Sequence, residues 1–231
     1  CLNRRHDSHE AHRAVELWKE NGIHNISIDL IYGLPGQTLE AWKTNVKEAI
    51  KLNIPHISAY MLTYEEGTAL YKMLQAGKIK PADDDLSLAL FTTLINMLTT
   101  AGYIHYEISN FAKQGFFSQH NSSYWTGKKY LGLGPAAHSY NGKNRQWNID
   151  SLPKYLEGIK NELPVTDGEI LNLFTCYNDY IVTRMRTMWG SKLADLQKLF
   201  GDNLKNYFFK AAQPYIKERL LIYNEDIIKL S

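Results

Sequence analysis

The sequence predicts an α/β fold built on a parallel sheet and followed by a smaller helical domain. Two apolar runs typical of strands, at residues 26–31 and 56–62, alternate with segments of helical periodicity, which is the pattern of βαβ units. After about residue 163, helical spacing of apolar residues dominates. We therefore expect two domains, residues 1–162 and residues 163–231. The hydrophobic content of 44% is enough to bury a core.

Local signals place the elements of the first domain. Thr38 and Asp83 each precede an apolar stripe at helical spacing and are expected to cap the helix that follows. Glycines at positions 22 and 102 end two of the helices. The expected elements are a helix near 11–22, a strand at 26–31, a helix at 38–50, a strand at 56–62, a helix at 83–102 and a strand at 103–109.

The second domain is predicted to contain three helices and a hairpin, an arrangement similar to a winged helix. Ser191 is the expected cap of the second helix and Gly201 its stop, while Pro214 is expected to kink the third. Within the first domain, residues 110–147 are rich in Gly, Asn, Ser and aromatic residues. Their weak periodicity predicts loops around a site.

Composition excludes several classes of protein. Lys and Arg number 26 and Asp and Glu number 24, so the net charge of +2 gives no sign of a nucleic-acid partner. No apolar run is long enough for a transmembrane helix, and no signal peptide is visible. The two cysteines, Cys1 and Cys176, do not form a disulfide framework and indicate a reducing, cytoplasmic location.

Asp29 is the first candidate site residue. Alternation in its strand places Ile28 and Leu30 on one face, and Ser27 and Asp29 on the other. Asp29 also lies near the carboxyl end of the strand, where α/β folds bind ligands. A carboxylate here is expected either to grip a ligand hydroxyl or ammonium group, or to cap nearby backbone amides.

The segment His-Asn-Ser-Ser-Tyr-Trp at residues 120–125 groups an imidazole, a carboxamide and two large rings. Such a set suits a porphyrin, because imidazole is a common ligand of heme iron and the rings can stack on a macrocycle. The alternative is a loop histidine bonded to backbone, with the aromatic rings closing the edge of a core. By themselves the residues favour this structural alternative.

Several segments in this order resemble the oxygen-independent coproporphyrinogen oxidase family of radical S-adenosylmethionine (SAM) proteins. The longest reads Ile-Asp-Leu-Ile-Tyr-Gly-Leu-Pro-Gly-Gln-Thr at residues 28–38. The pattern His-Asn-x-x-Tyr-Trp at residues 120–125 is similar to the heme-chaperone (HemW-type) branch. The matching segments are residues 2–6, 28–38, 56–60, 65–68, 102–103, 106–112, 120–125 and 131–139.

The resemblance implies the second half of a radical SAM partial (β/α) barrel, followed by a winged-helix-like domain. The family holds a 4Fe-4S cluster on three cysteines spaced Cys-x3-Cys-x2-Cys, a motif that this sequence does not contain. We therefore expect a fragment that lacks the cluster-binding segment, is inactive alone and can self-associate through its open sheet edge.

The resemblance also implies site residues and a function. Arg4 and Asp29, with Thr63 and His138, match positions at which the family contacts SAM. His120, Asn121, Tyr124 and Trp125 are the candidate heme-binding residues, with His120 as the ligand of the heme iron. The implied function is a heme chaperone that transfers heme to an acceptor protein. The alternative is the oxidase itself, which decarboxylates coproporphyrinogen III to protoporphyrinogen IX with SAM as cofactor.

Overall fold

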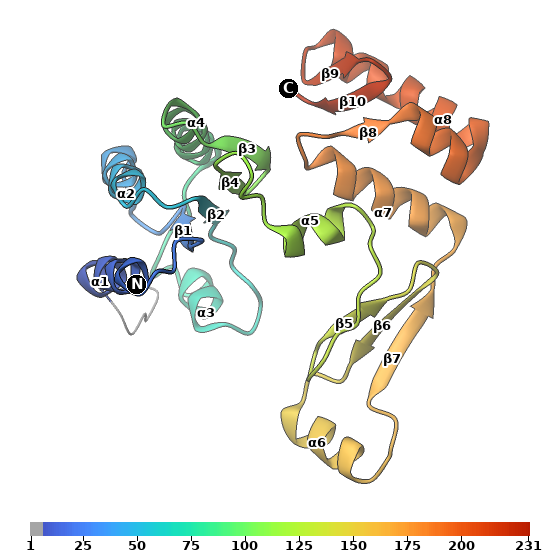
Figure 1. Ribbon diagram of the computed structural model, residues 1–231, viewed down its shortest axis with the longest axis horizontal. Coiled ribbons are helices and arrows are strands. Elements are labelled where there is room, and N and C mark those ends of the chain that lie inside the picture. The colour runs from blue at the N-terminus through green and yellow to red at the C-terminus, as the bar shows by residue number, and fades with distance from the viewer. Residues whose placement is uncertain (1–6) are drawn as a thin grey trace. The chain divides into compact units, whose positions relative to one another are not determined.

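The computed structural model describes residues 7–231, which divide into two compact units (Figure 1). The first unit runs to Phe117 and the second from Ser118 to Ser231. The boundary predicted after residue 162 lies inside the second unit and remains a prediction about domain organisation.

The first unit is built on a sheet with the strand order β1-β2-β4-β3. Strands β1 and β2 are parallel, with Ser27 opposite His56, as expected for a βαβ unit. The expectation of a parallel sheet is wrong for β3 and β4, which form an antiparallel hairpin that pairs with β2. The connection between β3 and β4 is too short for a parallel crossover. The elements are α1 (Ser8–Glu20), β1 (Ser27–Tyr32), α2 (Leu39–Lys51), β2 (His56–Met61), α3 (Ala69–Gln75), α4 (Asp84–Thr100), β3 (Ile104–Glu107) and β4 (Asn110–Ala112).

Helices α1, α2 and α4 cover one face of this sheet and bury its core. Thr38 and Asp83 cap α2 and α4, as predicted, by accepting hydrogen bonds from backbone amides in the first turn. Trp42 is fully buried, and its indole Nε1 donates to the carbonyl of Leu90 at 3.0 Å, which ties α2 to α4. The opposite face of the sheet is left for polar side chains.

The second unit contains two further sheets, with the strand orders β5-β6-β7 and β8-β10-β9. The expectation of loops over residues 110–147 is wrong where β4, α5, β5 and β6 form. The weak periodicity of this segment gave no signal for such short elements. The elements are α5 (Gln119–Trp125), β5 (His138–Tyr140), β6 (Asn144–Asn148), α6 (Leu152–Lys160), β7 (Thr166–Ile170), α7 (Leu173–Met185), β8 (Ser191–Lys192), α8 (Leu193–Lys217), β9 (Leu221–Asn224) and β10 (Ile227–Leu230).

The winged-helix-like part combines α7, α8 and the β9–β10 hairpin around a second core. Gly201 has a φ of 80°, which breaks α8 into the two predicted helices. The prediction that Ser191 caps the first of them is wrong, since Ser191 lies in β8. The cap comes instead from Asp226 in the hairpin turn, whose carbonyl and carboxylate accept from the amides of Leu193 and Ala194 at 2.8 and 2.9 Å.

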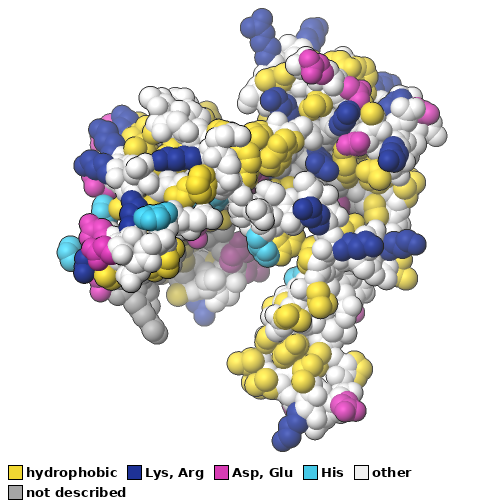
Figure 2. All heavy atoms as spheres, viewed as in Figure 1, with side chains coloured by type: hydrophobic (Ala, Val, Ile, Leu, Met, Phe, Trp, Pro, Cys, Tyr) yellow, Lys and Arg dark blue, Asp and Glu magenta, His cyan; other side chains and the backbone are white. Residues whose placement is uncertain are grey.

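Strands β5, β6 and β7 form an arm with α6 at its end (Figure 1). Figure 2 shows apolar side chains gathered on the surface of this tip. They belong to one face of α6 and to the loop that follows it, and each is more than half exposed: Leu152, Leu156, Ile159 and Leu163. Contiguous exposed apolar residues of this kind are typical of surfaces that bind partners.

Candidate functional site

The face of the first sheet opposite the helices carries the polar residues that the sequence singled out. Along β1, Ile28 and Leu30 pack against the core, whereas Ser27 and Asp29 are exposed. This confirms the predicted alternation and leaves the carboxylate of Asp29 accessible on the open face. Asp29 stands opposite Ser58 in the parallel register.

His56 of β2 is buried on this face within a chain of hydrogen bonds. Its Nδ1 lies 2.7 Å from Ser27 Oγ, and its Nε2 lies 2.7 Å from Tyr106 Oη. Burial lowers the pKa of His56 because the charged ring would lose its water, and the nearby carboxylate of Asp29 opposes this effect only in part. The ring is therefore neutral at pH 7, with one nitrogen donating and the other accepting.

A second set of buried hydrogen bonds supports the strand beside Asp29. Glu107 is 2% exposed, and its carboxylate accepts from the backbone amide of Ser109 at 3.1 Å and from Asn110 Nδ2 at 2.5 Å. Asn110 Oδ1 in turn accepts from Ser58 Oγ at 2.9 Å. Because buried polar groups are stable only when they are hydrogen-bonded, this set fixes the surface around Asp29.

The turn after β1 is an ordinary strand-to-helix turn and not an open anion cradle. The backbone amides of Gly33 and Leu34 donate to Gln37 Oε1 at 2.8 and 3.3 Å, so they are already engaged. Gly33 has a φ of 75°, which explains the residue type at this position. Thr63 is exposed just beyond β2, where the carboxyl ends of β1 and β2 meet through a bond from Leu62 N to Tyr32 O.

The four predicted SAM contacts therefore have different placements. Asp29 and Thr63 belong to the first unit, at or near the carboxyl ends of adjacent strands. His138 belongs to the second unit, in β5. Arg4 lies outside the residues that the structure describes. No group of three or more His, Cys, Asp or Glu side chains in residues 7–231 is placed to hold a metal ion.

The predicted heme-binding segment forms the short helix α5. His120 is exposed, and its ring meets that of Tyr124 edge-on, with 5.1 Å between their centres. Trp125 packs under the guanidinium of Arg186 at 4.3 Å. The indole Nε1 of Trp125 is buried and finds no acceptor among the described residues.

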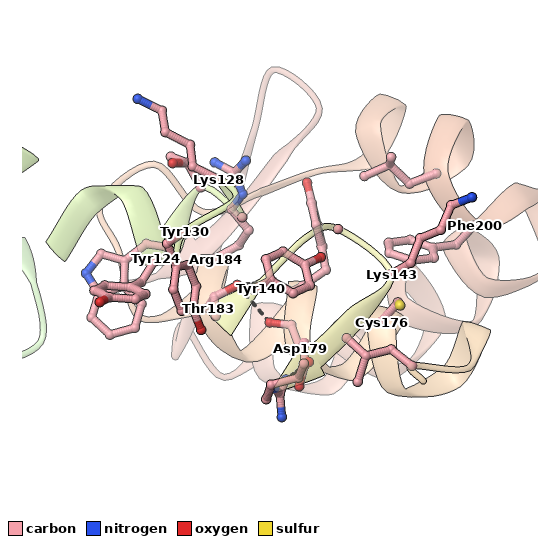
Figure 3. Close-up of a pocket in the computed structure, with 18 of the residues that line it drawn as sticks. Tyr124, Lys128, Tyr130, Tyr140, Lys143, Cys176, Asp179, Thr183, Arg184 and Phe200 are labelled. Carbon is pink, nitrogen blue, oxygen red and sulfur yellow. Dashed lines mark hydrogen bonds and ion pairs between the residues drawn. The ribbon is translucent and has the colours of Figure 1, made fainter. Parts of the chain in front are cut away.

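A cavity of about 960 Å³ opens beside α5 within the second unit (Figure 3). Its walls come from the end of α5 and the following loop, from β5 and β6, from α7, and from the first part of α8. Tyr124 and Trp125 line it, as does His138, whereas His120 and Asn121 are not among its lining residues. Two of the four predicted heme-binding residues, Tyr124 and Trp125, therefore line one cavity together with His138, a predicted SAM contact.

The cavity wall is aromatic and its ionic groups are mainly cationic. Burial raises the pKa of the phenols of Tyr130, Tyr140 and Tyr180, so these hydroxyls remain neutral. Arg145 is engaged with carboxylates, since it pairs with Asp179 and with Glu169 at 3.2 Å. The other lining cations are Lys128, Lys143 and Arg184.

Sequence reasoning missed most of this cavity. Tyr130 and Tyr140 flank the small-residue segment at 131–139, and a Tyr130–Tyr140 bridge brings them together. On α7, Cys176, Tyr180 and Arg184 recur every four residues and share one side of the helix. That spacing was the available signal, but by itself it equally fits a core-facing stripe.

No protein-family model matches the chain. The heme chaperone HemW of Lactococcus lactis is 30% identical over 224 residues, which cover 97% of this chain and 59% of that protein. HemW of Haemophilus influenzae is 42% identical over 137 residues, covering 59% of this chain and 35% of that protein. Coproporphyrinogen III oxidase (HemN) from Escherichia coli, described as a radical SAM enzyme, superposes with a TM-score of 0.79 at 21% identity, covering all of this chain and 56% of that one.

The match to HemN establishes the fold class, an α/β fold corresponding to the C-terminal part of a radical SAM protein. The sequence relatives are more specific, because they carry the heme-chaperone name at 30–42% identity. The chain belongs to the HemW/HemN-like family. It spans about three fifths of the length of the first curated relatives it matches.

Proposed function

We propose that the protein is a heme chaperone, which binds heme and transfers it to an acceptor protein. The observation that carries the proposal is the motif of α5, whose Tyr124 and Trp125 line an aromatic cavity with cationic side chains. Such a wall suits a flat apolar ring with acidic substituents. The relatives named heme chaperones support the same function.

His120 is the proposed ligand of the heme iron. Its imidazole does not line the cavity but contacts the ring of Tyr124, which does. The phenols inside the cavity are poorer candidates, because ligation by tyrosine requires the phenolate and burial raises their pKa.

SAM is proposed to bind at the polar face of the first sheet. An accessible carboxylate at Asp29, on a strand fixed by buried hydrogen bonds, fits the hydroxyl or ammonium groups of that cofactor. Thr63 and Arg4 are proposed as further contacts, together with His138. The two cysteines of this sequence do not fit a 4Fe-4S cluster, which is held by at least three cysteine thiolates.

A chaperone needs a partner that receives its cargo. The exposed apolar face of α6 is the kind of surface that a partner protein covers.

Self-association is proposed to occur through the edge of the first sheet. Within the described residues, β1 is paired on one side only, so its other side is open to a second chain. No helix in residues 7–231 combines the length and the apolar composition needed to cross a bilayer. A cytoplasmic location is proposed on the basis of the free thiol of Cys176.

A heme titration followed by absorbance tests the function. We expect a saturable shift of the Soret band that is lost in His120→Ala and retained in His24→Ala, an exposed histidine of the first unit. If the full-length protein gives no saturable shift, the chaperone function is wrong. A shift that persists in His120→Ala would keep heme binding but remove His120 as the ligand.

The second candidate function is oxidative decarboxylation of coproporphyrinogen III. The structural match to HemN favours it, since that protein is an oxidase with the same fold. Anaerobic incubation of the full-length protein with SAM, a reductant and coproporphyrinogen III decides between the two. Formation of protoporphyrinogen IX would establish the oxidase.

A further inference from the structure

The cavity of the second unit has the size and chemistry of a site for one large ligand. Its volume of about 960 Å³ lies at the upper end of the range for organic ligands, roughly 300–1,000 Å³. Leu171, Leu173, Leu199 and Phe200 add apolar surface to the tyrosine rings. A small polar metabolite would leave most of this wall without contacts.

The unpaired charge in the cavity is positive. In residues 7–231 no carboxylate pairs with the ammonium groups of Lys128 and Lys143, and the guanidinium of Arg184 lies over the ring of Tyr180 at 5.4 Å. The cavity's only acidic lining residue within this range, Asp179, is held by Arg145. Cations that no protein carboxylate neutralises favour an acidic ligand.

The cations are also unevenly distributed. Figure 3 shows Lys128 and Arg184 on the same side of the cavity as Tyr124 and Tyr130, and Lys143 on the opposite side with Cys176. Two cations can therefore meet one acidic edge of a ring.

We propose that this cavity holds a tetrapyrrole by its carboxylates, with Lys128 and Arg184 binding the acidic edge and the ring lying among the tyrosines. This inference rests on the proposed function and specifies where and in which orientation the cargo binds. The same geometry places Cys176 beside the ring, at the side away from the carboxylates.

The test uses the full-length protein and metal-free protoporphyrin IX, which needs no iron ligand. Lys128→Glu is expected to weaken binding roughly fivefold to tenfold, because an attraction at the carboxylates becomes a repulsion. The matched control is Lys154→Glu, an exposed residue of α6 that does not line the cavity, and its affinity should equal that of the unmodified chain. Protoporphyrin IX dimethyl ester, which has the same ring without the charges, should bind both variants equally.

A second readout comes from Cys176. Bound protoporphyrin IX should slow the alkylation of Cys176, followed on its own peptide by mass spectrometry, at least severalfold. Porphyrin binding with an unchanged alkylation rate, and with Lys128→Glu equal to Lys154→Glu, would overturn the cavity assignment while leaving the chaperone function intact. If the full-length protein binds neither heme nor protoporphyrin IX, both are wrong.

Discussion

Two histidines, the buried His56 and the half-buried His105, are expected to make the first unit sensitive to acid. Burial lowers the pKa of both below the ordinary value of about 6.5. The carboxylate of Asp29 opposes this only in part at His56, as does the hydrogen bond to the Ile108 carbonyl at His105. Below pH 6.5 the unfolded chain therefore binds protons that the folded unit does not. The contribution of the two neutral histidines to the free energy of unfolding is therefore fully present above pH 6.5. It is lost as the pH falls toward their pKa values in the folded state.

The size of the effect follows from proton linkage. Each histidine can remove at most about 1.4 kcal/mol per pH unit, so the pair sets a limit of about 2.7 kcal/mol per pH unit below pH 6.5. Protonation also reverses one hydrogen bond in the chain from Ser27 through His56 to Tyr106, because both ring nitrogens then donate and both hydroxyls must accept. His105 is half-buried, and its ring is stacked on that of Phe111 with 4.3 Å between their centres.

Urea unfolding between pH 7.5 and 5.0 measures this slope. Hydrogen exchange of peptides from β1 and β2 reports the first unit separately. We expect His56→Gln with His105→Gln to flatten the acid slope, whereas His24→Gln, an exposed control, should keep it. An acid slope that is the same in the double variant and the control would refute the assignment of the proton uptake to these two rings.

Two further changes test the candidate site and the winged-helix-like part. Asp29→Ala in the full-length protein should weaken SAM binding roughly tenfold or more, because a charged acceptor is removed, and an unchanged affinity by calorimetry would exclude its assigned role. Asp226→Ala should lower stability by about 0.5–2 kcal/mol, because the amide of Ala194 loses its acceptor. Asp226→Asn keeps an acceptor and should lie close to the unmodified chain in urea unfolding. Equal stability of the Ala and Asn variants would argue against the cap.

Predictions that depend on neighbouring residues mostly succeeded, although the cap predicted at Ser191 did not. The caps at Thr38 and Asp83 and the exposed face at Asp29 all follow from spacing along a single element. The pairing of β4 with β2 did not follow, because short strands carry little information about their partners. The cavity was not predicted for a similar reason. Tyr140 of β5 and Cys176 of α7 line the same cavity only because segments distant in the sequence pack together.

The cap supplied by Asp226 has a consequence for the order in which the chain folds. The residue before α8, Lys192, makes no side-chain cap, so the helix begins with its first amides bound by a turn more than thirty residues later. Closing that loop costs entropy before the contacts form. We therefore expect the hairpin and the start of α8 to become structured in the same late step, although the helix precedes the hairpin in the chain.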